Sequence, residues 1–184
     1  LDGTLYDQKK IRWYMILDIL TYDITRPGRL YELRVIYHFR KIRDTMTDTE
    51  NINEDQYTIV SKYLKIPQET IKKIISFWIE ERPLRFIKKC RYSYIPDLFK
   101  KITSQELKIG IVSDYPVEQK MKALELHADT MISSIDSDVN HFKPHPKGFL
   151  LAAKRLGLQN DECLVIGDRD EKDGLAALNA GMLY

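Results

Sequence analysis

The fold of this chain is decided by one stretch, Val165-Ile166-Gly167-Asp168-Arg169-Asp170-Glu171-Lys172-Asp173-Gly174. The apolar run over 163–166 predicts a buried strand, and the helical spacing over 173–180 predicts a helix soon after it. Asp168 is therefore expected at the carboxyl end of a strand, with Asp173 in the first turn of the following helix. Two carboxylates in these positions can face one cation, and hard oxygen ligands of this kind suit Mg²⁺.

The C-terminal half of the chain repeats this alternation of strand and helix. Apolar runs over 107–112 and 130–133, and a short one over 182–184, predict strands. The spacing over 116–126 and 146–156 predicts helices. Strands that alternate with helices predict an α/β fold with a doubly wound parallel sheet and right-handed crossovers. In such sheets a site lies at the carboxyl ends of the strands, and each polar segment here follows a strand.

Residues 8–89 have a different character, because their apolar spacing is helical and no strand signal interrupts it. Helices are predicted over 8–22 and over about 30–43. Asn53 is the predicted N-cap of a third helix, and Pro67 opens a fourth. This segment is therefore expected to form an inserted α-helical unit outside the sheet.

The first two of these helices each have an apolar stripe that is expected to face a core. In the first helix the stripe consists of Ile11, Met15, Ile16, Ile19 and Leu20. In the second it consists of Leu33, Ile36, Tyr37 and Arg40. The dipeptide Pro27-Gly28 is the predicted break between them.

The chain opens with Leu1-Asp2-Gly3-Thr4-Leu5-Tyr6-Asp7, which should follow directly on a buried strand. A turn at Gly3 lets the Asp2 carboxyl swing toward the leaving oxygen of a phosphate ester. There it can protonate the leaving alcohol and then deprotonate the water that completes hydrolysis. Taken alone, Asp-Gly is also a common turn dipeptide, so the other segments decide between the two interpretations.

Two further segments offer groups that bind phosphate. Ser113 ends an apolar run, and its hydroxyl and the backbone N–H of Asp114 can both donate to a phosphoryl oxygen. Lys143 precedes two prolines that restrain its loop, so its ammonium can be held beside a phosphate. His141 and His145 have no Cys or His partners at metal spacing, and they are expected to be solvated or capping residues.

In this order the four segments resemble the motifs of the haloacid dehalogenase-like (HAD) superfamily of phosphohydrolases. The first family motif reads Asp-x-Asp-Gly-Thr, the second is a Ser or Thr, the third is Lys-Pro-x-Pro, and the fourth is Gly-Asp followed after four residues by Asp. The resemblance covers residues 1–7 and 90–184 as an α/β core. The position of the insert, 8–89, is similar to that of the helical cap in phosphoglycolate phosphatase-like members.

The resemblance implies a Mg²⁺-dependent phosphatase that acts on small phosphorylated metabolites through an aspartyl-phosphate. Asp2 would be the general acid/base, whereas the nucleophilic Asp would be the residue just before Leu1. The chain as written is therefore expected to be inactive. Ser113, with the N–H of Asp114, and Lys143 would stabilise the phosphoryl charge.

The resemblance also implies the metal ligands. Asp168 would bind Mg²⁺ directly, and Asp173 would bind it beside Asp168 or act through water and Lys143. Asp2 would contribute its backbone carbonyl. Three other functions remain as alternatives. The protein could be a phosphomutase or a phosphonatase of the same family, or a non-catalytic binding protein with this fold. A dehalogenase fits less well, because family dehalogenases lack the carboxylate that Asp2 supplies.

Composition limits the class of protein. With 184 residues, 43% hydrophobic and 30% charged, the chain suits a globular fold with an inserted subdomain. No apolar run approaches the roughly 18 residues of a membrane span. The expected partner is a small phosphorylated substrate, and neither a membrane nor nucleic acid is expected. Cys90 and Cys163 lie far apart, which favours a reducing, cytoplasmic setting. Oligomeric state is not indicated.

The net charge of +2 is unevenly distributed. Residues 8–89 contain 17 Lys and Arg against 11 Asp and Glu, while the rest of the chain contains 12 against 16. A basic insert beside an acidic core fits a phosphorylated substrate. The alternative is that the surplus lysines only solvate helix faces.

Overall fold

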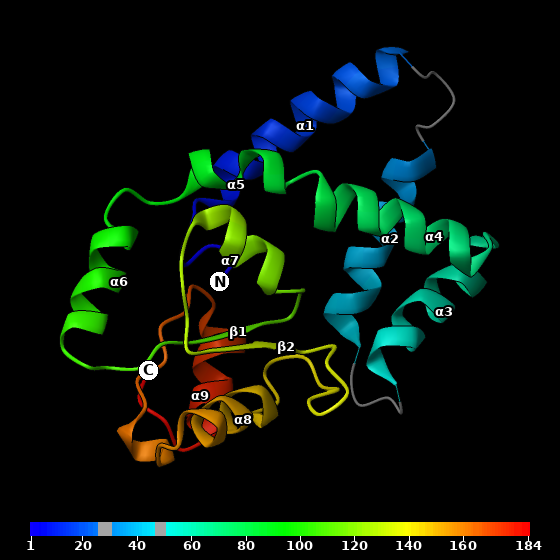
Figure 1. Cartoon of the computed structure of the whole chain (residues 1–184). Coiled ribbons are helices and arrows are strands. Elements are labelled where there is room, and N and C mark those ends of the chain that lie inside the picture. The colour runs from blue at the N-terminus through cyan, green and yellow to red at the C-terminus, as the bar shows by residue number, and fades with distance from the viewer. Residues whose placement is uncertain (26–30, 47–50) are drawn as a thin grey trace. The chain divides into compact units, whose positions relative to one another are not determined.

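The computed structural model describes residues 1–25, 31–46 and 51–184 (Figure 1). The chain divides into two compact units. The first unit comprises Leu1–Gln8 and Ile87–Tyr184, and the second comprises Lys9–Phe86. The second unit is thus a continuous insertion in the sequence of the first.

The first unit is built on two parallel strands, β1 (Gly110–Ser113) and β2 (Thr130–Ser133). Their register aligns Gly110 with Thr130 and Ser113 with Ser133. Helix α7 (Glu118–Leu124) connects them, and α8 (Lys147–Leu156) packs against both. A Cβ on Gly148 would lie 2.9 Å from Val112, so glycine lets the backbone of α8 approach the sheet closely.

Further helices complete the first unit. They are α6 (Ile95–Ser104), the 3₁₀ turn η2 (Asn160–Glu162), the π-helix η3 (Asp170–Gly174) and α9 (Leu175–Asn179). A core cluster joins α8 to α9 and the segment after it: Phe149, Ala153, Ala176, Ala177, Ala180 and Met182. Small alanines on both helices allow this close packing.

The strand predicted over 163–166 is not a regular strand, and neither is the one over 182–184. The described residues give one parallel bridge, Leu164 to Leu183, with two backbone hydrogen bonds beside it. Cys163 and Val165 pack on the core cluster, whereas Leu164 and Ile166 are 64% and 67% exposed. The segment buries one face only, and a single bridge does not make a ladder.

The second unit is helical, as predicted for the insert. Its helices are α1 (Gln8–Thr25), α2 (Tyr31–Thr45), α3 (Ile52–Leu64), α4 (Gln68–Ile75) and the π-helix η1 (Ser76–Glu81), and α5 (Leu84–Cys90) begins in it. The N-cap of α3 is Asn51, whose Oδ1 accepts from Glu54 N at 3.2 Å, so the prediction of Asn53 is wrong by two residues. The predicted break at Pro27-Gly28 lies outside the described residues.

The predicted buried face of α2 is wrong. The helix buries Glu32, Val35, Phe39 and Arg43. Leu33 and Tyr37 are 40% and 60% exposed. The cause is polar pairing that the apolar pattern does not reveal. Trp78 Nε1 donates to Glu32 at 2.7 Å, and Arg43 donates to Gln56 at 2.9 Å, so both charged groups are satisfied inside.

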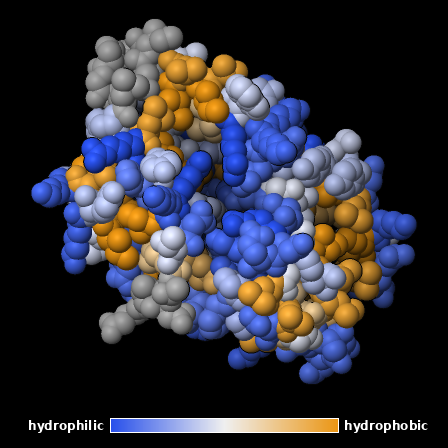
Figure 2. Space-filling model, turned by 180° about the vertical axis from the view of Figure 1, so that it is seen from behind, coloured by the Kyte–Doolittle hydropathy of each residue, from blue (hydrophilic) through white to orange (hydrophobic). Residues whose placement is uncertain are grey.

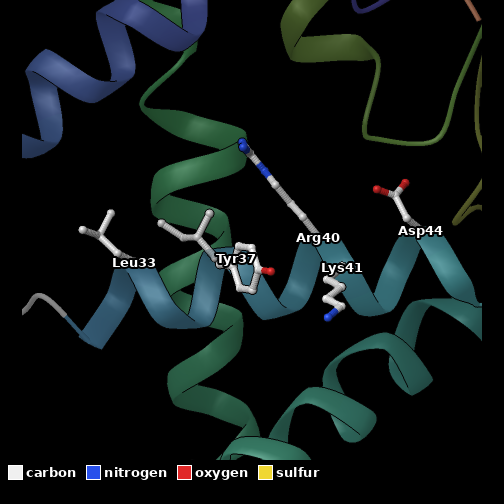
Figure 3. Close-up of a pocket in the computed structure, with 6 residues that line it drawn as sticks. Leu33, Tyr37, Arg40, Lys41 and Asp44 are labelled. Carbon is white, nitrogen blue, oxygen red and sulfur yellow. The ribbon is translucent and has the colours of Figure 1, made fainter.

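An adjoining face of α2 lines a pocket of about 530 Å³ (Figure 3). Its lining residues are Leu33, Ile36, Tyr37, Arg40, Lys41 and Asp44. Apolar side chains therefore occupy the N-terminal part of this face, and two cations follow them along the helix.

Helix α1 also departs from its prediction. Ile11 is buried, and Met15 and Ile19 are partly buried, but Ile16 and Leu20 are 48% and 56% exposed. Trp13 and Leu17 are exposed with them. Apolar side chains reach the surface in several places on the face shown in Figure 2. No helix among the described residues has the length and apolar character needed to span a bilayer.

Candidate active site

Asp2 is held by two side chains from different parts of the first unit. Lys120 Nζ, on α7, donates to both carboxylate oxygens at 2.8 and 2.9 Å, and the Tyr6 hydroxyl donates to Oδ1. Burial acts to raise the pKa of the Asp2 carboxyl. The Lys120 ammonium and the hydrogen bonds from Lys120 and Tyr6 act against that effect and lower the pKa. The carboxylate form is therefore strongly favoured.

The first and fourth motifs meet at Asp168. Thr4 Oγ1 donates to Asp168 Oδ1 at 3.0 Å. Gly3 has a φ of +89°, and a Cβ there would lie 2.1 Å from Asp168 Oδ2. Only glycine permits both this backbone conformation and this close approach. Among the described residues, no lysine or arginine forms an ion pair with Asp168, which is exposed.

The third and fourth motifs meet at an ion pair. Lys143 Nζ lies 2.5 Å from Asp173 Oδ1, and both side chains are about nine-tenths buried. Asp173 Oδ2 accepts from the backbone N–H of Arg169 at 3.3 Å. A Cβ on Gly167 would lie 2.4 Å from Asp173 Cβ, so glycine is required where the chain leaves the 163–166 segment.

The second and third motifs are joined through Asp114. Its Oδ1 accepts from Lys143 N at 3.2 Å and from Ser134 Oγ at 2.8 Å. Ser113 ends β1 and is buried, and its Oγ accepts from Tyr115 N at 3.2 Å. The side chain of Asp114 therefore anchors the Lys143 loop, in addition to the backbone role predicted for it.

The side chains of the three predicted metal ligands, Asp2, Asp168 and Asp173, have different surroundings. Within the described parts of the chain, no three or more His, Cys, Asp or Glu side chains lie in position to hold a metal ion. Asp2 is engaged by Lys120 and Asp173 by Lys143, which leaves Asp168 as the accessible carboxylate. His145 Nδ1 accepts from Lys147 N at 3.2 Å at the start of α8, in agreement with a capping role.

Lys120 is the site residue that sequence reasoning missed. Val117, Met121 and Leu124 mark the buried face of α7, at spacings of three and four residues. Lys120 occupies a position on that face and is 7% exposed. A lysine within the apolar stripe of a helix is the signal that could have revealed it, because a buried ammonium needs a partner.

Comparison with known proteins gives the class. The sequence model of the haloacid dehalogenase-like hydrolase family matches residues 1–181, so the chain belongs to this family. A hydrolase from Pseudomonas syringae has a similar structure, with a TM-score of 0.57 at 22% identity, covering 99% of this chain and 79% of that chain. At this identity the likeness concerns the fold, and it confirms the predicted doubly wound α/β class.

Curated relatives match parts of the chain. A glyceraldehyde 3-phosphate phosphatase from Methanopyrus kandleri is 36% identical over 92 residues, which are 48% of this chain and 39% of the relative. A phosphoglycolate phosphatase from Salmonella choleraesuis is 29% identical over 93 residues, 49% of this chain and 36% of the relative. The matched region is thus well under two thirds of these relatives.

Proposed function

We propose that the protein is a phosphatase that hydrolyses small phosphorylated metabolites through an aspartyl-phosphate, with Mg²⁺ as cofactor. The observation that supports this most strongly is the meeting of four motif segments in one unit. Thr4 reaches Asp168, Lys143 reaches Asp173, and Asp114 joins the Lys143 loop to the end of β1. Relatives named as phosphatases of small phosphate esters support the same substrate class.

The proposed reaction has two half-reactions. First, a carboxylate from the residue before Leu1 attacks phosphorus, the bond to the leaving oxygen breaks, and the Asp2 carboxyl gives that oxygen its proton. A substrate phosphate adds negative charge beside Asp2, which favours the protonated form needed here. Second, Asp2 takes a proton from water as the water oxygen attacks phosphorus. The aspartyl–phosphate bond then breaks and inorganic phosphate leaves.

The phosphoryl group is bound by donors that the chain supplies. The Ser113 hydroxyl, the Asp114 N–H and the Lys143 ammonium would donate to its oxygens. Asp173 pairs with Lys143 at 2.5 Å and thereby fixes the direction of the ammonium. Its part in the site is therefore proposed to be orientation of Lys143, with any contact to the metal made through water.

The residues present fit Mg²⁺ at one position. Asp168 offers an exposed carboxylate with hard oxygen atoms. The Gly3 backbone lies so close to this carboxylate that a Cβ on Gly3 would overlap it. Asp168 and the Asp2 backbone carbonyl would hold the ion. When bound, Mg²⁺ would offset the negative charge of the phosphate and the nucleophile.

The test uses the complete protein with its natural residue before Leu1. We expect hydrolysis of phosphoglycolate or glyceraldehyde 3-phosphate, loss of at least about 100-fold in kcat in Asp168→Asn, and weaker Mg²⁺ binding by calorimetry. Glu171→Gln, an exposed acid of the same loop, is the control and should leave both unchanged. An Asp168→Asn protein with normal turnover and normal Mg²⁺ affinity would contradict the assignment of Asp168 as a Mg²⁺ ligand.

The alternatives are decided by two observations on the same protein. Asn, Ser or Gly before Leu1, with no hydrolysis of any phosphate ester, would favour a non-catalytic binding protein. Transfer of phosphate to a second sugar hydroxyl would indicate a phosphomutase, and cleavage of a carbon–phosphorus bond would indicate a phosphonatase.

Cys90 and Cys163 are both free thiols, which supports a reducing, cytoplasmic setting.

A further inference from the structure

We infer that Lys120 is a positioning residue, which holds the Asp2 carboxyl group where it can exchange a proton with the leaving oxygen. The inference rests on the proposed function and adds a residue that no family motif in this sequence contains. Lys120 lies on α7, which follows the second motif in the sequence, whereas Asp2 lies in the first motif.

The contact is close and shielded from water. Lys120 Nζ lies 2.8 Å from Asp2 Oδ1 and 2.9 Å from Oδ2, so one ammonium engages both oxygens. The side chains are 9% and 18% exposed. The Tyr6 hydroxyl also donates to Oδ1, and Tyr6 is itself 4% exposed. Three donor contacts therefore restrict rotation of this carboxylate.

A lysine at this place needs an explanation, because burial of an ammonium is costly unless it is paired. The neighbours on the same helix face, Val117, Met121 and Leu124, are apolar and almost fully buried. An apolar side chain would fit that face without the cost. The Lys120 ammonium also lies 5.1 Å from the centre of the Tyr115 ring, a cation–π distance, so its stem and head are both confined.

Confinement of Lys120 matters for the reaction because proton transfer depends on position. A general acid or base must come within hydrogen-bond reach of the oxygen that it serves. A displacement of about 1 Å can cost about 100-fold in rate. Of its two side-chain partners, Lys120 and Tyr6, the Asp2 carboxylate would keep only Tyr6 if Lys120 were replaced. It could then turn away from the leaving oxygen.

Two substrates with different leaving groups distinguish a positioning role of Lys120 from a purely structural one, because a structural defect would slow both reactions. An alkoxide needs a proton as it leaves, so hydrolysis of an alkyl phosphate depends on Asp2. Dinitrophenolate is stable without a proton, so its release in the first turnover depends on phosphoryl transfer alone. A variant that disturbs only the proton donor should therefore slow the first reaction and spare the second.

The experiment compares Lys120→Met with wild type in the complete, Mg²⁺-loaded protein. Lys122→Met is the matched control, since Lys122 lies two residues further along α7 and is exposed. The probes are phosphoglycolate or glyceraldehyde 3-phosphate, whichever the wild type hydrolyses, and 2,4-dinitrophenyl phosphate in stopped flow. We expect Lys120→Met to lower kcat on the alkyl phosphate about 100-fold, with KM and the dinitrophenolate burst rate changed less than about threefold.

A double-mutant cycle covers the case in which Lys120→Met leaves Asp2 buried without its cation and the protein folds poorly. Asp2→Asn removes the charge, so Asp2→Asn/Lys120→Met should fold and should be no slower than Asp2→Asn alone. Lys120→Arg keeps a cation and should restore at least about a tenth of the wild-type rate.

Three outcomes separate the hypotheses. Equal losses on both substrates, or a rate on the alkyl phosphate that is unchanged or higher, would overturn the role of Lys120 and leave the proposed function standing. An additive loss in the double variant would do the same. A wild-type protein inactive on both substrates would overturn the proposed function itself, and the role of Lys120 with it.

Discussion

Gly3 is the residue at which backbone conformation and site geometry depend on each other most directly. Its φ of +89° lies where L side chains are strained, and the space that a Cβ would need is filled by the Asp168 carboxylate. The obstacle is the end of a side chain rather than backbone. A larger residue should therefore displace Asp168 more than it unfolds the protein.

We predict that Gly3→Ala separates activity from stability. Backbone strain should lower the free energy of unfolding by about 1–2 kcal/mol, measured in urea. Movement of Asp168 should weaken Mg²⁺ binding and lower kcat at least about tenfold, because the carboxylate would no longer lie beside the Gly3 turn.

Gly157→Ala and Gly181→Ala are the matched controls for this prediction. Both positions have positive φ, +69° and +70°, but no atom lies within 4 Å of the Cβ that they would gain. They should show the same loss of stability with normal activity. A Gly3→Ala protein as active as these controls would mean that the Gly3 turn does not govern Asp168.

At this scale the sequence predicted the motif residues but not their partners. Lys143 and Asp173 were expected near each other, and they form an ion pair. The bond from Lys120 to Asp2 joins residues 118 positions apart, and no local pattern specifies such a pair. The structure also gives the Asp114 side chain an anchoring contact that the motif alone does not imply.

Among the elements, the π-helix η1 has a clear structural consequence in the second unit. Its wide turns bring Phe77 and Trp78 against Arg82, whose guanidinium lies 5.2 and 5.7 Å from the two ring centres. The Tyr22 ring of α1 lies at 5.3 Å. Arg82 also donates twice to Asp18 of α1, each bond being 2.6 Å long. This cluster fastens α1 to η1.

We predict that Asp18→Asn destabilises the second unit by about 2–3 kcal/mol, because it leaves the largely buried Arg82 without its anionic partner. The side chains of Arg82 and Asp18 are 19% and 10% exposed, so solvent screens the pair only partly. The measurement is urea unfolding of the complete protein.

The control for Asp18→Asn is an exposed pair in the same unit. Glu69 and Lys72 lie 3.8 Å apart with side chains 78% and 32% exposed, so Glu69→Gln should cost less than about 1 kcal/mol. Equal effects of the two substitutions would show that the Asp18 bond contributes no more than a surface ion pair.

Helix positions were predicted well, and helix faces poorly. Both faces of α2 contain apolar residues, so periodicity could not choose between Leu33 with Tyr37 and Val35 with Phe39. The choice depends on Trp78 and Gln56, which lie far along the chain and accommodate Glu32 and Arg43. Likewise, the 163–166 segment has the composition of a strand but pairs through one bridge among the described residues.

At the scale of the whole molecule, charge is divided between the two segments that the sequence distinguishes. Residues 8–89 carry the excess of Lys and Arg, and the motif-bearing remainder carries the excess of Asp and Glu. We propose that the helical unit acts as a cap and that its cations attract the anionic substrate. Arg40 and Lys41 are candidates, because they follow apolar residues along the α2 pocket.

We predict that KM rises with salt while kcat changes little, because screening weakens attraction of the substrate before it weakens contacts inside a site. Between about 0.05 and 0.5 M NaCl, KM should rise several-fold in steady-state assays of the complete protein. Arg40→Gln/Lys41→Gln should raise KM at low salt and flatten this dependence.

Lys62→Gln/Lys65→Gln removes the same charge from exposed positions near the end of α3, and it is the control. Identical curves for the two double variants would show that net charge, rather than the α2 face, attracts the substrate. A KM that is independent of salt in the wild type would show that the basic residues only solvate helix faces.

The distribution of tryptophan gives the two units different optical properties. The chain contains two tryptophans, Trp13 and Trp78, and both belong to the second unit. Trp13 is 67% exposed and Trp78 is 3% exposed. Emission excited at the red edge of tryptophan absorption therefore originates from the helical insertion alone, and its blue-shifted component originates from Trp78. Red shift of that component on heating or in urea would register melting of the insertion, while circular dichroism follows the whole chain.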